Sequence, residues 1–212
     1  RQRQMCIRDS IEAAETGWQL RDGTGAVILQ AGIVVVAAGW GSAGLVPGLA
    51  LAPVRGQANW VEGVQTGPVA WGGYAVPTGS GVLFGATHDR GETDGGPSDE
   101  ATARNLKTVA ARLPQLAAQI AEAGPVQART AVRATTPDRL PLAGAMPGVD
   151  GLFVLGGMGS RGFCVAPLLA EHVAALATGT PSPLPADLAA RISPLRNAVV
   201  ATLAQSVGRV DG

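Results

Sequence analysis

The sequence predicts a mixed fold of the α/β class with an α+β part, and three observations support this prediction. Residues 32–39 form a β-branched run without alternation, which indicates a parallel strand buried on both faces. Residues 53–96 hold short strand candidates separated by glycine and proline, as in an antiparallel sheet. Residues 151–178 give a strand, a glycine-rich turn and a helix in succession.

The composition limits the class of protein. Hydrophobic residues make up 46% of the chain, and 16 basic residues balance 16 acidic ones, which argues against a strongly basic nucleic-acid-binding protein but leaves room for a local RNA-binding patch. No apolar run reaches the about 18 residues that cross a bilayer, and the first ten residues lack the apolar core of a secretory signal, so no membrane association is expected. The distant Cys6 and Cys164 predict neither a disulfide scaffold nor a metal site, and a cytoplasmic location is the default.

In the first part of the chain, a hairpin is predicted ahead of the buried strand. The first ten residues share no pattern with the rest of the chain, and their native origin stays open; residues 1–15 are interpreted as a tail. Residues 18–21 and 26–29 flank the turn cluster Asp22-Gly23-Thr24-Gly25, which predicts the hairpin. The strand within residues 32–39 then ends in a glycine-rich loop.

The middle of the chain is predicted to form strands and then two helices. Three strand candidates are found at residues 54–61, 69–76 and 81–86. A helix over residues 98–113 begins at Ser98, a favourable capping residue, and ends before Pro114. A second helix runs from there to Glu122, and residues 126–134 return as a strand.

The last part of the chain holds the clearest unit. Residues 151–156 are predicted as a buried strand, residues 157–162 as a turn, and residues 163–178 as a helix that Gly179 ends. A proline-rich linker then leads into a C-terminal helical segment within residues 181–212.

The turn at residues 157–162 is a candidate ligand site. A strand that passes through glycines into a helix directs backbone N–H groups and the positive end of the helix dipole at one point, and it lets a flat or anionic ligand approach the backbone. Gly157, Gly159 and Gly162 satisfy the G-x-G-x-x-G spacing, but no acidic residue follows a second strand about 20 residues on. Nicotinamide binding is therefore disfavoured, while a plain tight turn remains an alternative.

Residues 151–171 resemble the C-terminal flavin motif of the D-amino-acid-oxidase-like FAD oxidoreductases. Other segments resemble that family in the same order, namely residues 33–40, 53–57, 85–90, 105–106 and 133–141. The resemblance covers roughly residues 16–196, and within the family it is strongest to the branch that modifies tRNA.

The resemblance implies FAD as the cofactor and an organisation in two interleaved parts. Residues 16–52 and 149–180 are expected to form part of an FAD-binding, Rossmann-like parallel sheet, into which residues 53–148 insert an antiparallel substrate domain. The family's G-x-G-x-x-G strand–turn–helix unit would lie before residue 16 and is not in this sequence. An upstream half of the same polypeptide is therefore an expected partner.

The resemblance also implies which residues act. The expected FAD-binding residues are Ala38, Gly39, Gly56, Gln57, Gly157, Met158, Gly159, Ser160, Arg161 and Gly162. Arg133 and Arg161 are the candidate catalytic residues, because an arginine fork suits the carboxylate that the family's substrates carry. As alternatives, Arg133 lies exposed on a strand, Arg161 caps a loop, and Gln57 only pins a strand.

The implied reaction is oxidation of a C–N bond in a secondary amine. In the tRNA-modifying branch, the substrate would be a 5-carboxymethylaminomethyl-2-thiouridine at the tRNA wobble position, which loses its carboxymethyl group. The alternatives are an oxidase of a small amino acid such as glycine or sarcosine, and a non-catalytic fragment. For contact with tRNA, the candidate residues are Arg90, Arg104, Arg112, Arg129 and Arg139.

Overall fold

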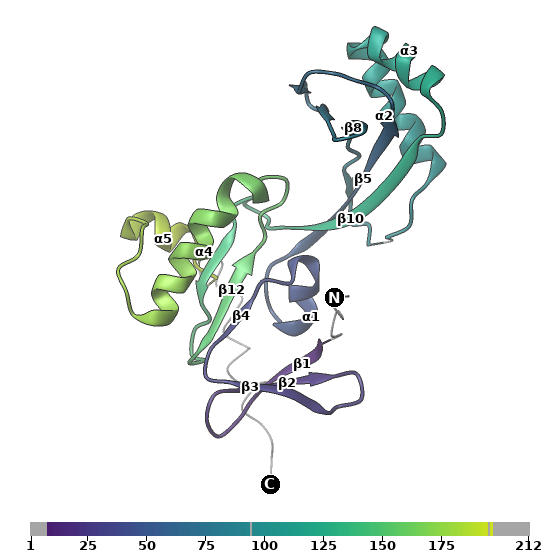
Figure 1. Ribbon diagram of the computed structural model, residues 1–212. Coiled ribbons are helices and arrows are strands. Elements are labelled where there is room, and N and C mark those ends of the chain that lie inside the picture. Colours follow the sequence, from purple (N-terminus) through teal and green to yellow (C-terminus); the bar gives the residue numbers. More distant parts are fainter. Residues whose placement is uncertain (1–7, 94, 195, 197–212) are drawn as a thin grey trace. The chain divides into compact units, whose positions relative to one another are not determined.

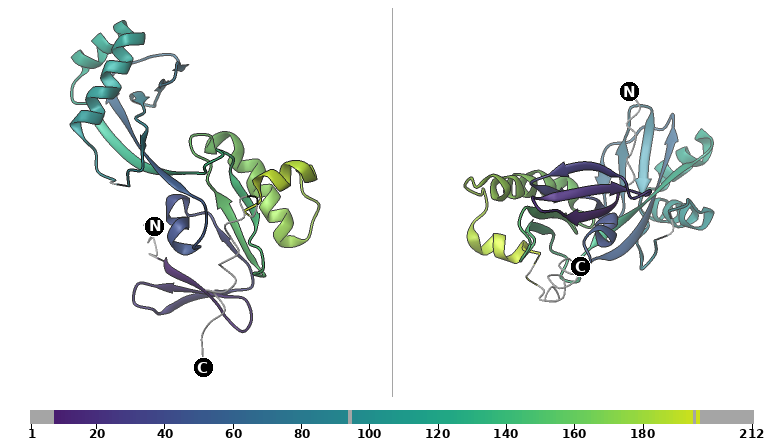
Figure 2. Two further views of the ribbon diagram at one scale, coloured as in Figure 1. Left: turned by 180° about the vertical axis from the view of Figure 1, so that it is seen from behind. Right: turned by 90° about the horizontal axis from the view of Figure 1, so that it is seen from below.

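The computed structural model describes residues 8–93, 95–194 and 196, shown from three sides in Figures 1 and 2. The chain divides into two compact units. Unit 1 contains the described residues up to 52 and from 134 onward, and unit 2 contains residues 53–133. The segment that forms unit 2 is therefore inserted into unit 1 along the chain.

Unit 1 is built on a small mixed sheet with the strand order β11–β12–β4. Strand β12 (Leu152–Gly156) runs parallel to β4 (Val34–Val36) and antiparallel to β11 (Leu142–Ala145). Helix α4 (Gly162–Thr178) packs on β11 and β12, and the short α5 (Ala186–Ile192) packs on β11. The predicted strand–turn–helix unit is thus confirmed, and Gly179 ends α4 in the left-handed conformation.

Strand β4 differs from its prediction in burial. Val34 and Val36 are buried, but Val35 is 43% exposed and Ile33 is 49% exposed. The prediction of a strand buried on both faces was wrong because β4 lies at the edge of the described sheet, and α4 packs on β11 and β12 instead.

A second sheet in unit 1 contains the predicted hairpin. Strands β2 (Trp18–Asp22) and β3 (Val27–Ala31) pair antiparallel, and Asp22 Oδ1 accepts hydrogen bonds from the N–H groups of Thr24 and Ala26 in the turn. Residues 8–13 were interpreted as part of a tail, but they form strand β1 on the other side of β2. Ile11 packs against the core that Trp18 and Leu20 join, so burial of apolar surface holds this strand in place.

Unit 2 is an antiparallel sheet with two helices. The sheet has the order β10–β5–β8–β7–β6, with β9 also beside β5, which confirms the predicted antiparallel pairing. The strands are β5 (Ala52–Glu62), β6 (Val69–Ala70), β7 (Tyr74–Pro77), β8 (Gly81–Gly85), β9 (Asp89–Arg90) and β10 (Gln127–Thr135). Helices α2 (Asp99–Arg112) and α3 (Pro114–Ala123) supply Val109, Leu116 and Ile120 to a core with Phe84.

Local sequence explains the two helices of unit 2. The Ser98 Oγ accepts a hydrogen bond from the Ala101 N–H at 3.2 Å, so Ser98 caps α2 as predicted. Pro114 begins α3, a position that needs no N–H donor. Within the described residues, no helix has the length and apolar character needed to cross a bilayer.

Candidate active site

In unit 1, two loops with predicted cofactor-binding residues leave the same end of the sheet. Val36 of β4 pairs with Val154 of β12, and the two strands are parallel. The loop that begins at Ala38 and Gly39 and the turn of residues 157–162 therefore follow neighbouring carboxyl ends. In open α/β sheets this edge is where ligands bind.

The turn that leads into α4 requires glycine. Gly157 and Gly159 have φ values of 66° and 57°, which side chains rarely adopt. A Cβ on Gly157 would also lie 2.9 Å from Thr136 Cγ2, so the turn fits closely over the neighbouring loop. The Gly159 N–H donates to the Ala134 carbonyl at 3.0 Å and fixes the turn to the end of β10.

The N-terminus of α4 has no side-chain cap. Arg161 occupies the capping position but its side chain accepts no hydrogen bond there. The first N–H groups of a helix lack partners within the helix, and the dipole adds about half a positive charge at this end. This end of unit 1 is therefore able to stabilise a negatively charged or electron-rich group.

The Arg161 side chain contacts the loop of residues 136–140. Its Nη2 donates a hydrogen bond to the carbonyl oxygen of Arg139, a residue with φ of 61°. Arg161 itself is exposed to solvent. The structure thus shows the loop contact that was one of the two interpretations of Arg161, and it leaves the role in substrate binding as a prediction.

An ion pair holds the same loop from the other side. The Arg196 guanidinium donates two hydrogen bonds to the carboxylate of Asp138, at 2.7 and 3.0 Å. This contact with Arg196 is the main reason why the pKa of Asp138 lies well below its ordinary value. The Leu140 N–H also donates to Asp138 Oδ1 at 3.0 Å, so the loop has a fixed shape.

Sequence reasoning missed Ser42. Its hydroxyl is fully buried and has no hydrogen-bond partner among the described residues. Ser42 begins the short α1 (Ser42–Leu45), directly after the 3₁₀ turn η1 (Gly39–Gly41). A serine just beyond the carboxyl end of a parallel strand was the available signal, because a buried hydroxyl without a partner is costly and marks a candidate ligand contact.

In unit 2, the predicted Gly56 and Arg133 lie against each other on neighbouring strands. The Arg133 guanidinium covers Gly56, and a Cβ at Gly56 would lie 2.6 Å from the guanidinium carbon. The Nη1 of Arg133 is buried and has no hydrogen-bond partner among the described residues. A buried cationic donor without an acceptor favours an anionic ligand, since leaving it unpaired costs at least about 1–3 kcal/mol.

The predicted cofactor residue Gln57 holds α2 on the sheet. Its Oε1 accepts from the Ser98 N–H at 2.8 Å, and its Nε2 donates to the Ser98 carbonyl at 3.0 Å and to Thr102 Oγ1 at 2.9 Å. The Asn105 Nδ2 donates hydrogen bonds to the backbone carbonyl of Gln57 and to Asn59 Oδ1, each at 2.8 Å. These bonds use the polar atoms of the buried Gln57 side chain, which supports the interpretation that it pins a strand.

A second charged cluster in unit 2 involves Asp89. Arg104 donates two hydrogen bonds to its carboxylate, at 2.7 and 3.0 Å, and Arg55 lies 3.4 Å away. Arg104 is the main cause that lowers the pKa of Asp89. Arg104, a candidate for RNA contact, is thus already engaged. In the part of the chain that the structure describes, no group of three His, Cys, Asp or Glu side chains could hold a metal ion.

The sequence matches a known protein family over most of its length. Residues 3–176 match the DAO family, described as FAD dependent oxidoreductase. The chain belongs to this family. The predicted resemblance is therefore confirmed, and so is the predicted mixed α/β class.

Individual relatives agree with the family. The chain is 51% identical over 185 residues to the tRNA 5-methylaminomethyl-2-thiouridine biosynthesis bifunctional protein MnmC of Caulobacter vibrioides, a match that covers 86% of this chain and 31% of that protein. It is 50% identical to the protein of the same name from Caulobacter sp. (strain K31), with 84% of this chain and 30% of that protein covered.

Among solved structures, the chain resembles glycine oxidase from Geobacillus kaustophilus. The TM-score is 0.76 at 27% identity, and the match covers 89% of this chain and 51% of that one. The chain thus spans under a third of the curated relatives and about half of this structure.

Proposed function

We propose that the chain is part of an FAD-dependent enzyme that oxidises a C–N bond of a secondary amine carrying a carboxylate. As substrate we propose 5-carboxymethylaminomethyl-2-thiouridine in the wobble position of tRNA, from which the carboxymethyl group is removed. The identity of 50–51% with relatives named for tRNA 5-methylaminomethyl-2-thiouridine biosynthesis supports this choice. The structural observation that supports it most directly is the unpartnered Arg133 Nη1.

Arg133 is suited to hold the carboxylate of such a substrate. Its guanidinium presents a fork of N–H donors that matches two carboxylate oxygens, and Gly56 leaves the space in which it lies. A carboxylate that accepts from Nη1 removes the cost of a buried donor without a partner. The proposed contact fixes the substrate and orients its amine.

Unit 1 carries most of the residues proposed to hold FAD, which when bound supplies the acceptor for a hydride from the carbon beside the amine. The close-fitting turn at residues 157–162 lets a flat ring approach the backbone, and the uncapped amides of α4 stabilise negative charge. Ala38 and Gly39 belong to the second loop at this sheet edge and are exposed, so their backbone is accessible. The buried Ser42 hydroxyl after them is a further donor.

The upstream half of the same polypeptide is the proposed partner of unit 1. Strand β4 lies at the edge of the described sheet, and Val35 on it and Ile33 just before it are about half exposed. A further parallel strand beside β4, with its own covering layer, would bury these side chains as parallel sheets require. The partial coverage of the relatives supports this proposal.

Oxidation of glycine or sarcosine is the second candidate function. The similarity to glycine oxidase favours it, and these substrates also carry a carboxylate beside the amine. The two candidates share the roles proposed for Arg133 and for the turn before α4. They differ in whether RNA must be bound.

The first experiment asks whether the chain holds a flavin. The chain is mixed with excess FAD and desalted, and a retained absorbance band near roughly 450 nm shows bound oxidised flavin. A colourless protein supports the non-catalytic fragment instead. The flavin-loaded protein is then kept free of oxygen and mixed with tRNA that carries the modified uridine, with glycine or with sarcosine. Loss of the absorbance band reports reduction of the flavin by that compound. Bleaching by glycine but not by tRNA would reject the tRNA reaction.

The variant Arg133→Lys tests the carboxylate contact. Lysine keeps the charge but loses the fork, so we expect half-saturation by substrate to rise about 10- to 100-fold while the flavin band stays unchanged. Arg191→Lys, at an exposed arginine of α5 with no proposed role in binding, is the matched control. Equal behaviour of the two variants would reject the role of Arg133.

A further inference from the structure

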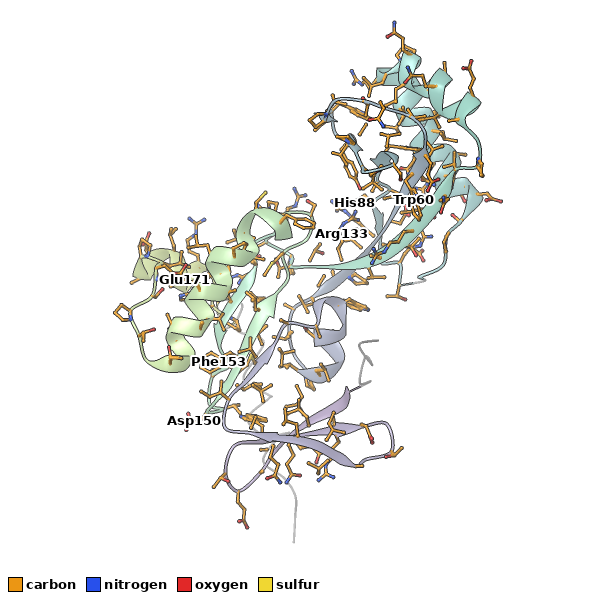
Figure 3. All side chains as sticks on the ribbon, in the orientation of Figure 1. Trp60, His88, Arg133, Asp150, Phe153 and Glu171 are labelled. Atoms are coloured by element: carbon orange, nitrogen blue, oxygen red, sulfur yellow. The ribbon has the colours of Figure 1, made fainter. Side chains whose placement is uncertain are left out.

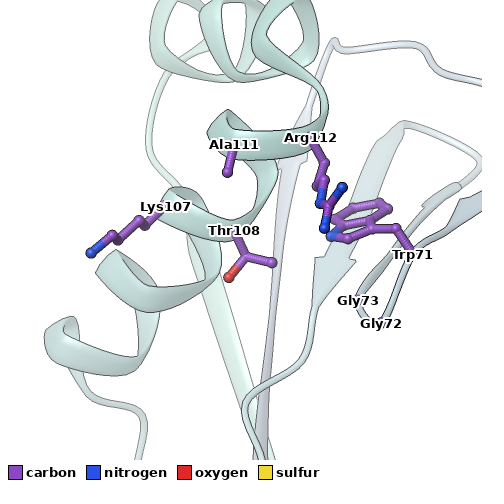
Figure 4. Close-up of a pocket in the computed structure, with 7 residues that line it drawn as sticks. All are labelled: Trp71, Gly72, Gly73, Lys107, Thr108, Ala111 and Arg112. Carbon is purple, nitrogen blue, oxygen red and sulfur yellow. The ribbon is translucent and has the colours of Figure 1, made fainter.

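A pocket in unit 2 lies between helix α2 and the turn that joins β6 to β7. It has a volume of about 380 Å³ and is lined by Trp71, Gly72, Gly73, Lys107, Thr108, Ala111 and Arg112. Figure 4 shows Lys107, Thr108, Ala111 and Arg112 on α2, with the Arg112 side chain beside the Trp71 indole and the Lys107 side chain directed away from it. The volume falls in the range of about 300–1,000 Å³ that is usual for sites of small ligands.

Small residues keep the pocket open. Ala111 is the small residue between the two cations on α2, and the opposite wall is the Gly72-Gly73 turn. Gly72 has φ of 104°, and a Cβ on Gly73 would lie 2.9 Å from the Gly85 carbonyl oxygen and 3.3 Å from the Trp71 ring. Side chains on this turn would therefore strain it or press on the ring.

Three donors of the pocket lack an acceptor among the described residues, whereas the Thr108 hydroxyl donates to the Arg104 carbonyl at 2.8 Å. Lys107 and Arg112 are exposed, and neither forms an ion pair with any described residue. The Trp71 Nε1 is buried and has no hydrogen-bond partner among the described residues. No acidic residue lines the pocket. Two cations and an unused N–H around one cavity favour an anionic ligand with several acceptor oxygens.

The charge of α2 itself does not reverse this preference. Arg112 is the last residue of α2, where the helix dipole contributes about half a negative charge. Two full positive charges beside the pocket exceed that contribution. An aromatic ring next to cations is moreover the combination that single-stranded nucleic acids bind, through their bases and phosphates.

We propose that this pocket binds a phosphodiester group of tRNA, with Lys107 and Arg112 on the phosphate and the Trp71 N–H donating to an acceptor of the same nucleotide. The proposal rests on the proposed function, since only the tRNA reaction requires RNA to be held. It separates the candidate arginines of unit 2: Arg104 is occupied by Asp89, whereas Arg112 is available. Contacts of this kind fix the position of the RNA without reading its sequence.

The test measures binding of fluorescently labelled tRNA by anisotropy, at several salt concentrations between 50 and 200 mM, roughly the range over which phosphate contacts weaken. For the double variant K107A/R112A, we expect the affinity for tRNA to be about tenfold lower at low salt. The slope of log affinity against log salt concentration should be smaller in magnitude by about 1. Both side chains are exposed, so the fold should be unaffected. Trp71→Phe keeps a ring but removes the N–H, and we expect binding about two- to tenfold weaker.

The comparison is the double variant R90A/R129A, which removes the same charge from two exposed arginines of unit 2 that are rival candidates for tRNA contact, and the pocket proposal requires a smaller loss there. Equal loss in both double variants would show diffuse electrostatic attraction and overturn the pocket. Tight binding of adenosine 5′-monophosphate, with tRNA affinity unchanged in K107A/R112A, would assign the pocket to a free phosphorylated ligand. A wild-type chain that binds no tRNA would instead reject tRNA as the substrate, and the pocket proposal with it.

Discussion

In unit 2, helices α2 and α3 supply side chains to the core of the antiparallel sheet, and Ala75, Val82 and Phe84 have no surface exposed to solvent. Unit 1 leaves large apolar side chains in contact with solvent. Among the described residues, the exposed large hydrophobic side chains all belong to unit 1, namely Val27, Ile28, Leu29, Ile33, Val35, Phe163, Leu168, Leu176 and Leu188. Figure 3 shows the side chains of both units, with Phe153 beneath α4. Unit 2 therefore has a completed core, whereas unit 1 keeps apolar surface that a further layer could cover.

The buried polar groups of the described residues fall into two kinds. In unit 2, Gln57, Asn59 and Asn105 satisfy one another and the start of α2, so this cluster is structural. Three buried polar atoms without a partner are found among the described residues, at Ser42, Trp71 and Arg133. Gly41 precedes Ser42, the Gly72-Gly73 turn follows Trp71, and Gly56 lies under the Arg133 guanidinium. The difference indicates which polar residues serve the fold and which are available for binding.

The largest expected effect contrasts two phenylalanines. Phe84→Ala in unit 2 should lower the free energy of unfolding by about 3–5 kcal/mol, because it leaves a cavity in a fully buried core. Phe163→Ala in unit 1 should change it by less than about 0.5 kcal/mol, because that side chain is fully exposed. Urea unfolding of both variants measures the difference. A large loss in Phe163→Ala would mean that another molecule covers this side chain in solution.

The second contrast compares the glycines of the two candidate binding regions. Gly157→Ala should cost about 2 kcal/mol, since it combines a positive φ with a close approach to Thr136. Gly56→Ala should cost less than about 1 kcal/mol, because the atoms in its way are the movable end of the Arg133 side chain. Thermal unfolding ranks the two.

Gly56→Ala should nevertheless impair function. The guanidinium must leave its position over residue 56, so substrate half-saturation should rise as in Arg133→Lys while stability is kept. If Gly56→Ala binds substrate normally, the position of Arg133 over Gly56 has no role in recognition.

The third contrast concerns acid sensitivity. His172 is buried in α4 of unit 1, with Nδ1 2.7 Å from Ser182 Oγ, and burial lowers its pKa. Below about pH 6.5 the unfolded histidine binds a proton that the folded one resists, so unit 1 should lose stability as pH falls, by at most about 1.4 kcal/mol per pH unit. The loss ends once pH drops below the lowered pKa of the folded state.

Hydrogen exchange resolves this effect by unit. Peptides from α4 should lose protection between pH 7 and pH 5, whereas peptides from α2 should not, after correction for intrinsic exchange rates. His172→Leu should remove the difference. The lowered pKa of Asp138 does not interfere, because its contribution to stability is lost only near and below its ordinary value of about 3.9. Equal loss in both units would assign the acid sensitivity to other groups.

The sequence predicted the elements that depend on local signals. The hairpin at Asp22–Gly25, the capped start of α2 at Ser98 and the stop of α4 at Gly179 are set by residues within a few positions of each other. The family motifs also located the turn before α4 and named Gly56 and Arg133 as separate site residues. These predictions need no knowledge of distant contacts, whereas the contact of Arg133 with Gly56 on a neighbouring strand is shown only by the structure.

Features that depend on distant partners were missed. Val35 belongs to a strand whose composition is typical of a buried strand. Only the sheet order and the exposure of Val35 show that the face of β4 that carries it is uncovered. Residues 8–13 carry no clear strand pattern, and their pairing with β2 determines their conformation. For Gln57, the sequence left a cofactor contact and a structural role open, and only its bonds to Ser98 and Thr102, more than 40 residues away, show that it holds α2. Tertiary context decides such residues, and local sequence does not contain it.

The smallest expected effect is a gain in the stability of unit 1. Arg139 adopts φ of 61°, a conformation that costs a residue with a side chain about 1–2 kcal/mol. Arg139→Gly removes this strain but adds flexibility to the unfolded chain, which offsets about 0.5–1 kcal/mol, so a net gain of about 0.5–1 kcal/mol is expected. The backbone bonds of the loop persist, because the residue 139 N–H donates to the Thr136 carbonyl and its carbonyl accepts from Arg161 whatever the side chain. Arg139→Ala keeps the positive φ without the arginine and should show no gain. A rise in the unfolding midpoint in both variants would therefore locate the cost in the charge of Arg139, close to Arg161, and a rise in the glycine variant alone would locate it in the backbone.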